Sequence, residues 1–251
     1  MFRRKITLAL LLISTSAWAD TYSSLTTGMD ISTGKYGGTT STNILYIPLT
    51  GKLQIDDLFL KLTVPYISIT SAGSGVVKGM GPFKITSGAK TSTQAGLGDV
   101  IASAGYTVLD SEDFILDLVG NIKFGTADAN KNLGTGENDY SAQIDGFYIL
   151  NTSTLLATLG YKVIGAPAGV TVNNIGYGSI GVSHKMGKAN SAGIALDAAQ
   201  SSSALSPGAR ELSVFISNRI SPSLKIQANL LKGFSDSSPN IGASLMLTGT
   251  Y

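Results

Sequence analysis

The chain has 251 residues, of which 43% are hydrophobic, with a formal net charge of +2 and no cysteine. The absence of cysteine excludes a disulfide framework, and the small charge gives no indication of a nucleic-acid partner. No apolar run after Ile13 approaches the ~18 residues that a membrane-spanning helix requires.

The first twenty residues have the pattern of a secretory signal peptide. Basic residues at positions 3–5 precede an apolar segment at 6–13, and Ala17-Trp18-Ala19 supplies the small residues of a cleavage site. The apolar segment is too short for an uncleaved helical anchor. We therefore predict a signal peptide at 1–19 and one domain at 20–251. Cleavage would remove three positive charges and leave a formal charge of −1.

After this peptide, apolar and polar residues alternate in about twelve segments. A period of two is typical of a strand with one apolar and one polar face. The clearest segment runs from Phe114 to Phe124, with Asp117, Asn121 and Lys123 on the polar parity. The two rings are roughly 33 Å apart along a strand, or about 23 Å in height at a ~45° tilt, which matches the ~25 Å apolar band of outer-membrane barrels. The segments are 22–34, 40–51, 58–70, 98–109, 114–124, 140–151, 155–165, 175–187, 192–203, 210–221, 224–235 and 241–251.

The final segment places Leu245, Leu247 and Tyr251 on one parity and ends on the aromatic residue. A soluble domain rarely leaves such a strand at a sheet edge, whereas a closed barrel pairs its last strand with its first. This ending also resembles the assembly signal of bacterial outer-membrane barrels. We therefore predict an all-β, transmembrane antiparallel barrel of about twelve strands in a bacterial outer membrane. Its expected partners are membrane lipid, lipopolysaccharide and the barrel assembly machinery.

The connections between segments alternate in length. Turns such as 110–113 and 221–223 are short, whereas 71–95 and 127–139 are long, which fits short periplasmic turns and longer outer loops. Pro65 falls inside a segment and predicts a bulge or an early strand end, because proline removes a ladder hydrogen bond. Apolar residues of the first long loop are candidates for a plug or gate at the barrel mouth: Val76, Val77, Met80 and Phe83.

A soluble exported sandwich or barrel shows the same alternation and is the alternative fold. The membrane barrel is favoured because roughly twelve strands would otherwise have to pair their apolar faces without lipid.

Two stretches carry a resemblance to a known family. The first is Gly96-Leu97-Gly98-Asp99-Val100; the second is Lys123-Phe124-Gly125-Thr126-Ala127-Asp128, followed by Leu133-Gly134-Thr135-Gly136 and Asp139-Tyr140. Together they resemble the outer-membrane family named for the meta-pathway of phenol degradation, whose members are described as transport-type barrels. That family commonly has Pro-Thr-Gly where this chain has Gly125-Thr126-Ala127. The resemblance covers about 96–140 and implies transport of small, aromatic or apolar, molecules.

The polar parity of the segments collects charged residues of both signs. Either these charges pair with one another and fill the interior, or they line a narrow polar passage, since twelve strands exceed the number whose side chains simply fill a barrel. A wall of mixed sign would not select strongly for ionic charge. The lumen-facing candidates are Lys61, Asp117, Lys123, Asp145, Lys162, Asp197, Glu211, Arg219 and Lys225.

Two motifs imitate chemical sites. Asp128 to Asp139 has the length of a calcium loop, but Leu133 occupies the sixth position, where such loops need glycine. We interpret it as a polar surface loop. His184 follows Ser183, yet neighbouring strand residues point to opposite faces, so a structural histidine on the outer face is favoured.

These observations predict a channel or transporter for small-molecule solutes. The alternatives are a plugged structural or adhesive barrel without transport, and a barrel-embedded lipid-modifying enzyme. No catalytic residue, metal ligand, cofactor or nucleic-acid partner is predicted.

Overall fold

The computed structural model describes residues 21–36, 38–72, 74–77, 81–85, 91–203 and 207–251. The predicted signal peptide therefore lies outside the described residues. A helix long and apolar enough to cross a membrane is not found in the described ranges.

Nearly all regular structure in these ranges is β-strand, as the alternating sequence predicts. A single 3₁₀ turn, η1 (Ala129–Lys131), interrupts one of the described loops. The strands are β1 (Thr21–Gly34), β2 (Thr42–Ile55), β3 (Leu58–Ala72), β4 (Ser74–Val77), β5 (Gly81–Ile85), β6 (Thr91–Leu97), β7 (Val100–Asp110), β8 (Phe114–Phe124), β9 (Asp139–Leu150), β10 (Ser153–Val163), β11 (Ile175–Lys185), β12 (Asn190–Ala199), β13 (Arg210–Ser221), β14 (Leu224–Gly233) and β15 (Ile241–Thr250).

The sheet closes on itself because β1 pairs with β2 on one side and with β15 on the other. Beyond β15, the N–H of Tyr251 donates to the carbonyl of Ser23 at 2.8 Å, and the Ser23 N–H donates back at 3.1 Å. β6 and β7 pair with successive parts of β3 and act as one spanning strand, while β4 and β5 form a separate hairpin. The result is the closed, twelve-stranded antiparallel barrel that the sequence predicted.

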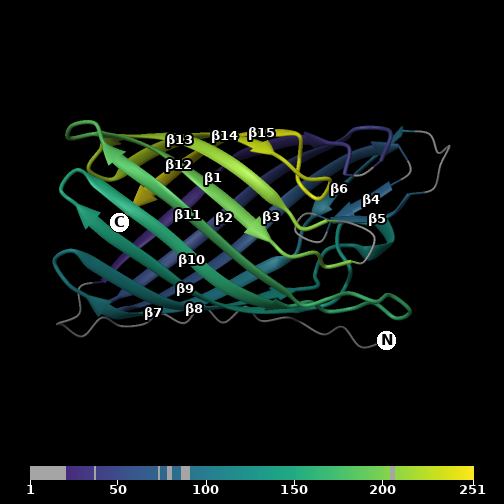
Figure 1. The fold of residues 1–251 in the computed structure, drawn as a ribbon, viewed down its shortest axis with the longest axis horizontal. Helices are drawn as coiled ribbons and strands as arrows, with labels where there is room; N and C mark the ends of the chain where they lie inside the picture. The colour runs from purple at the N-terminus through teal and green to yellow at the C-terminus, as the bar shows by residue number, and fades with distance from the viewer. Residues whose placement is uncertain (1–20, 37, 73, 78–80, 86–90, 204–206) are drawn as a thin grey trace, which may run out of the picture.

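The two ends of the barrel differ in their connections (Figure 1). At the end we call the turn end, on the left of the figure, short turns join β2 to β3 and β9 to β10. Asp56 and Asn151 in these turns have φ of 49° and 51°, the left-handed conformation that tight hairpins require. At the opposite loop end, longer connections and the β4–β5 hairpin extend from the wall.

The barrel wall separates the two parities of each strand. Large apolar side chains of the outer parity stay exposed: Leu159 is 72% exposed, Ile180 64% and Leu245 49%. A soluble barrel would bury this face, because apolar surface in water is unfavourable. The predicted arrangement with an apolar outer face is therefore confirmed over the soluble alternative.

The fourth predicted segment begins earlier than expected and is interrupted. β6 already pairs with β3, so the ladder resumes within the predicted loop 71–95. The register with β3 then shifts by one residue at Gly98 and Asp99, where the Gly98 N–H donates to the Pro65 carbonyl at 2.8 Å. β3 itself runs through Pro65 without an early end, and the bulge, the other predicted outcome, occurs at this position. The extra residue lies on the neighbouring strand, opposite a proline that has no N–H to offer.

Candidate functional site

Cross-strand neighbours on the inner face of the barrel form continuous rows. Directly opposite residues of an antiparallel pair point to the same side of the sheet, and a row that crosses tilted strands winds around the lumen. One such row, the lysine row, holds three lysines and no acidic residue. It runs from β1 to β10 through Ser24, Lys52, Lys61, Ser103, Asn121, Ser141 and Lys162.

A second row, two residues nearer the turn end, contains two aromatic rings, each directly opposite a glycine. A Cβ added to Gly105 would overlap the Phe59 ring, and one added to Gly160 would overlap Tyr177. Each ring therefore lies flat over the glycine directly opposite, an arrangement known to stabilise glycine within strands. Rings held against the wall leave the centre of the lumen free. This aromatic row runs through Gln54, Phe59, Gly105, Val119, Gln143, Gly160 and Tyr177.

A third row, again two residues nearer the turn end, carries the acids. Asp117 accepts a hydrogen bond from Thr107 Oγ1 at 2.7 Å, and Asp145 accepts one from Thr158 Oγ1 at 2.6 Å. Gln143 Nε2 donates to both oxygens of Asp145 at 2.8 Å. Hydroxyl and amide groups thus provide partners for these two carboxylates. The acidic row runs through Thr107, Asp117, Asp145, Thr158, Ser179, Asp197 and Glu211.

The ammonium groups of the lysine row lie over the rings of the aromatic row. Lys52 Nζ and Lys61 Nζ lie 4.9 Å and 5.7 Å from the centroid of Phe59, within the range of a cation–π contact. Lys162 Nζ lies 6.0 Å from the centroid of Tyr177. Among the described residues, none of these three lysines has a carboxylate at ion-pair distance. They therefore present positive charge to the lumen.

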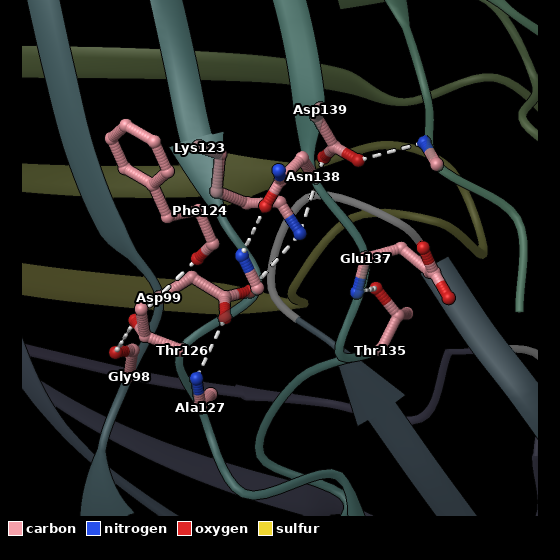
Figure 2. Close-up of polar contacts among 12 residues, drawn as sticks. Gly98, Asp99, Lys123, Phe124, Thr126, Ala127, Thr135, Glu137, Asn138 and Asp139 are labelled. Carbon is pink, nitrogen blue, oxygen red and sulfur yellow. Dashed lines mark hydrogen bonds and ion pairs between the residues drawn. The ribbon is translucent and has the colours of Figure 1, made fainter.

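At the loop end, Lys123 joins two nearly buried carboxylates (Figure 2). Its Nζ lies 3.0 Å from Asp99 and 3.4 Å from Asp139, whose side chains are 9% and 5% exposed. Asp99 also accepts the N–H of Ala127 at 2.9 Å, and Asp139 accepts the N–H of Gly165 at 3.1 Å. This Lys123 network ties two loops to the inner wall with charge-assisted hydrogen bonds.

Further hydrogen bonds join the two stretches that carry the family resemblance. Thr126 Oγ1 donates to the Gly98 carbonyl at 3.2 Å and accepts the Val100 N–H at 2.9 Å. The N–H of Gly125 donates to Asn138 Oδ1 at 2.9 Å. Figure 2 shows Gly98, Thr126 and Asn138 close to the Lys123 network. Stretches far apart in the sequence therefore build one structural unit.

Most residues of 127–139 are exposed, as expected for a polar surface loop, but the apolar residues of this loop fold inward. Leu133 is only 3% exposed and, with Ala127, belongs to a buried cluster that includes Ile44 and Ile67 of the inner wall. Burial of these apolar groups favours a loop folded into the mouth over one extended into water. This loop narrows the loop end of the lumen.

The predicted plug falls partly outside the described residues. Val76, Val77 and Phe83 belong to the β4–β5 hairpin, and Met80 is not among the described residues. The plug therefore stays a prediction.

A cavity of about 560 Å³ lies inside the barrel near the loop end. Lys123 and Lys162 line it together with Asp30 and Glu211, so its wall carries both signs of charge. Tyr36, in the loop after β1, also lines it and is 6% exposed. Burial raises the pKa of Tyr36 to about 12, so this tyrosine stays neutral at physiological pH.

The nine predicted lumen residues are distributed over these features rather than gathered in one place. Lys61 and Lys162 belong to the lysine row and Lys123 to its own network. Arg219 and Lys225 lie opposite each other near the turn end. The remaining four belong to the acidic row: Asp117, Asp145, Asp197 and Glu211.

Sequence reasoning missed Lys52, Asp99 and Asp139. The predicted second segment ends at residue 51 and therefore omits Lys52, whereas β2 continues to Ile55. Asp99 belongs to the first stretch that carries the family resemblance, and Gly96 and Gly98 just before it are the sequence signal of an irregular strand at this point.

The side chains of the calcium-loop-like stretch and of the Ser183-His184 pair make structural contacts. His184 Nδ1 lies 2.9 Å from Ser153 Oγ on the adjacent strand, rather than contacting Ser183. Asp128 accepts the Asn130 N–H at 3.0 Å and caps η1. Within the described ranges, no group of three or more His, Cys, Asp or Glu side chains is arranged to hold a metal ion.

The fold is similar to that of solved outer-membrane channels. An outer membrane channel from Pseudomonas putida F1 superposes with a TM-score of 0.68 at 14% identity, covering 95% of this chain and 97% of that protein. The NanC porin superposes with a TM-score of 0.57 at 8% identity, covering 90% and 99%. No protein-family model and no curated protein matches the sequence. At these identities the similarity shows the barrel fold, and the family resemblance stays a prediction.

Proposed function

We propose that this protein is a passive channel for small molecules in a bacterial outer membrane. The observation that carries the proposal is the contrast between the two faces of one closed barrel. The outer face exposes leucine and isoleucine, whereas the inner face carries rows of charged, hydroxyl and amide side chains around a cavity of about 560 Å³. A polar interior behind an apolar outer band is the arrangement of membrane-spanning channels.

Aromatic residues of the outer face support the location in a membrane. Phe124, Tyr140 and Tyr161 lie on strands near the loop end, and Tyr106 and Tyr148 lie near the turn end, all of them exposed. Two such girdles mark the interfaces between lipid and water in outer-membrane barrels. The same geometry supports lipopolysaccharide and membrane lipid as neighbours and the barrel assembly machinery as the partner for insertion.

The inner wall favours an open passage over a filled interior. Phe59 and Tyr177 lie flat over glycines instead of projecting across the lumen. Within the described residues Lys123 is ion-paired, whereas the three lysines of the lysine row have no carboxylate at ion-pair distance, so the interior is not a set of mutually neutralised charges. The family resemblance further supports small aromatic or apolar solutes and membership in the phenol meta-pathway family.

Planar-bilayer recording of the purified, detergent-folded protein tests the proposal. Discrete conductance steps in KCl are expected, with weak selectivity between potassium and chloride because both signs line the wall. A correctly folded protein that inserts and stays silent would support the plugged or adhesive barrel. Lipid hydrolysis lost on His184→Ala would support an enzyme.

A further inference from the structure

Lys52 and Lys61 form a like-charged pair on the inner wall. They lie directly opposite each other on β2 and β3, where like charges destabilise an antiparallel ladder. Neither has a carboxylate at ion-pair distance among the described residues. An anion held between the two ammonium groups would remove this repulsion, because it would make charge-assisted hydrogen bonds to both.

Aromatic surface surrounds the same two ammonium groups. Phe59 is 8% exposed and contacts both lysines, whereas Tyr22 is 44% exposed and lies on the other side of Lys52. Lys52 Nζ lies 5.4 Å from the Tyr22 centroid and donates to its hydroxyl at 3.3 Å. The exposed Tyr22 ring therefore offers a stacking surface beside an anion site.

We propose that Lys52, Lys61, Tyr22 and Phe59 form a binding site for a small aromatic carboxylate. The carboxylate lies between the two ammonium groups, and its ring packs against Tyr22. A simple inorganic anion uses the lysines but leaves the ring exposed, and a neutral aromatic molecule uses the ring but leaves the two charges in repulsion. The combination of both surfaces selects the aromatic anion.

The site rests on the proposed channel function, because it lies on the wall of the lumen. Lys162 over Tyr177 repeats the combination of cation and ring on the same two rows. Lys52 lies three residues from the turn end of β2, whereas Lys162 lies one residue from the loop end of β10. The lysine row and the aromatic row therefore run from the turn end toward the loop end. They place a second cation beside an aromatic ring, Lys162 over Tyr177, at the loop-end cavity.

Block of the KCl current by three probes tests the site: benzoate, acetate and benzyl alcohol. Benzoate is expected to block at a lower concentration than either of the others. Lys52→Gln and Lys61→Gln are each expected to raise the half-blocking concentration of benzoate about tenfold, the loss of one charge-assisted hydrogen bond. Lys225→Gln is the matched control, because Lys225 and Arg219 also oppose each other on the inner parity, but among the described residues no aromatic ring lies against Lys225. It is expected to change the block by less than about twofold.

Equal block by benzoate and acetate would overturn the aromatic part of the proposal. An equal loss of block in the Lys225→Gln variant would overturn the site and leave only general attraction of anions. If the channel proves silent, the proposed function fails, and calorimetric titration of the folded protein in detergent with benzoate decides the site independently. No binding of benzoate there, with each variant shown to be folded by its mobility on an unboiled gel, would refute it.

Discussion

Replacing Lys123 by glutamine removes the ammonium that joins Asp99 and Asp139. Both carboxylates are nearly buried and would lose the ammonium that they share, and removing one partner from a buried ion pair costs about 3–5 kcal/mol. The ladder of the barrel does not depend on this side chain, so the loss falls on the docking of the loop at 125–138. Since about 1.4 kcal/mol is a factor of ten, exchange of the Ala127 amide should accelerate roughly a hundredfold to several thousandfold.

Hydrogen exchange followed by NMR in detergent micelles measures this effect directly, because the Ala127 N–H donates to Asp99. The matched control is Lys131→Gln on the same loop. Lys131 lies 3.9 Å from Asp128 in a pair whose side chains are 52% and 43% exposed, and such a pair contributes little. Unchanged protection of Ala127 in a folded Lys123→Gln barrel would refute the assigned role of the network.

Three further changes test the wall and the mouth. Gly105→Leu should force the Phe59 ring into the lumen and lower the single-channel conductance, and a conductance equal to that of the wild type would show that the ring does not lie over the glycine. Tyr36 keeps its proton in the folded protein up to about pH 12, whereas an unfolded tyrosine loses it near pH 10. The preference for neutral Tyr36 therefore contributes fully below pH 10, and the stability falls by roughly 2–3 kcal/mol as the pH rises through 12. The phenolate absorbance that Tyr36→Phe lacks should appear near pH 12, and its appearance near pH 10 would contradict the raised pKa. Leu245→Arg on the outer face should cost about 2–4 kcal/mol and reduce the folded band on an unboiled gel, whereas Ser244→Arg on the inner face should not.

Much of the wall was predictable because parity follows directly from a period of two. The prediction gives the segment from Phe114 to Phe124 both of its boundaries, since every position of its outer parity is apolar or glycine and polar turns flank it. The second segment was ambiguous, because Ile44 and Tyr46 are apolar on the inner parity. Ile44 is in fact buried beneath the inward loop. An apolar residue that packs under a loop gives the same local signal as one that faces lipid.

The rows of the lumen were not predictable from any single segment. Lys52, Lys61 and Lys162 lie on three strands, and their common row depends on the register of each intervening pair. Register is fixed by turn geometry and by bulges, which a hydrophobic pattern does not reveal. The flat rings over glycine are likewise a cross-strand property, because each glycine and its ring are distant in sequence.

The bulge at Gly98 and Asp99 explains how the loop at 125–138 is held from one strand at two points. Gly96 pairs with Ile67 on the inner face, where a Cβ would lie 3.0 Å from Leu133 Cδ1. Asp99, three residues further along, also points inward and binds Lys123. In an unbroken strand, residues three apart point to opposite faces, so one of these two contacts would face lipid. Because of the extra residue, Gly96 and Asp99 both point inward. The extra residue lies opposite Pro65, where the ladder already lacks a hydrogen bond because proline has no N–H. The first stretch that carries the family resemblance, Gly96 to Val100, therefore forms a bulge. The physical role of this bulge is to bring the inward loop and the Lys123 network to the same wall.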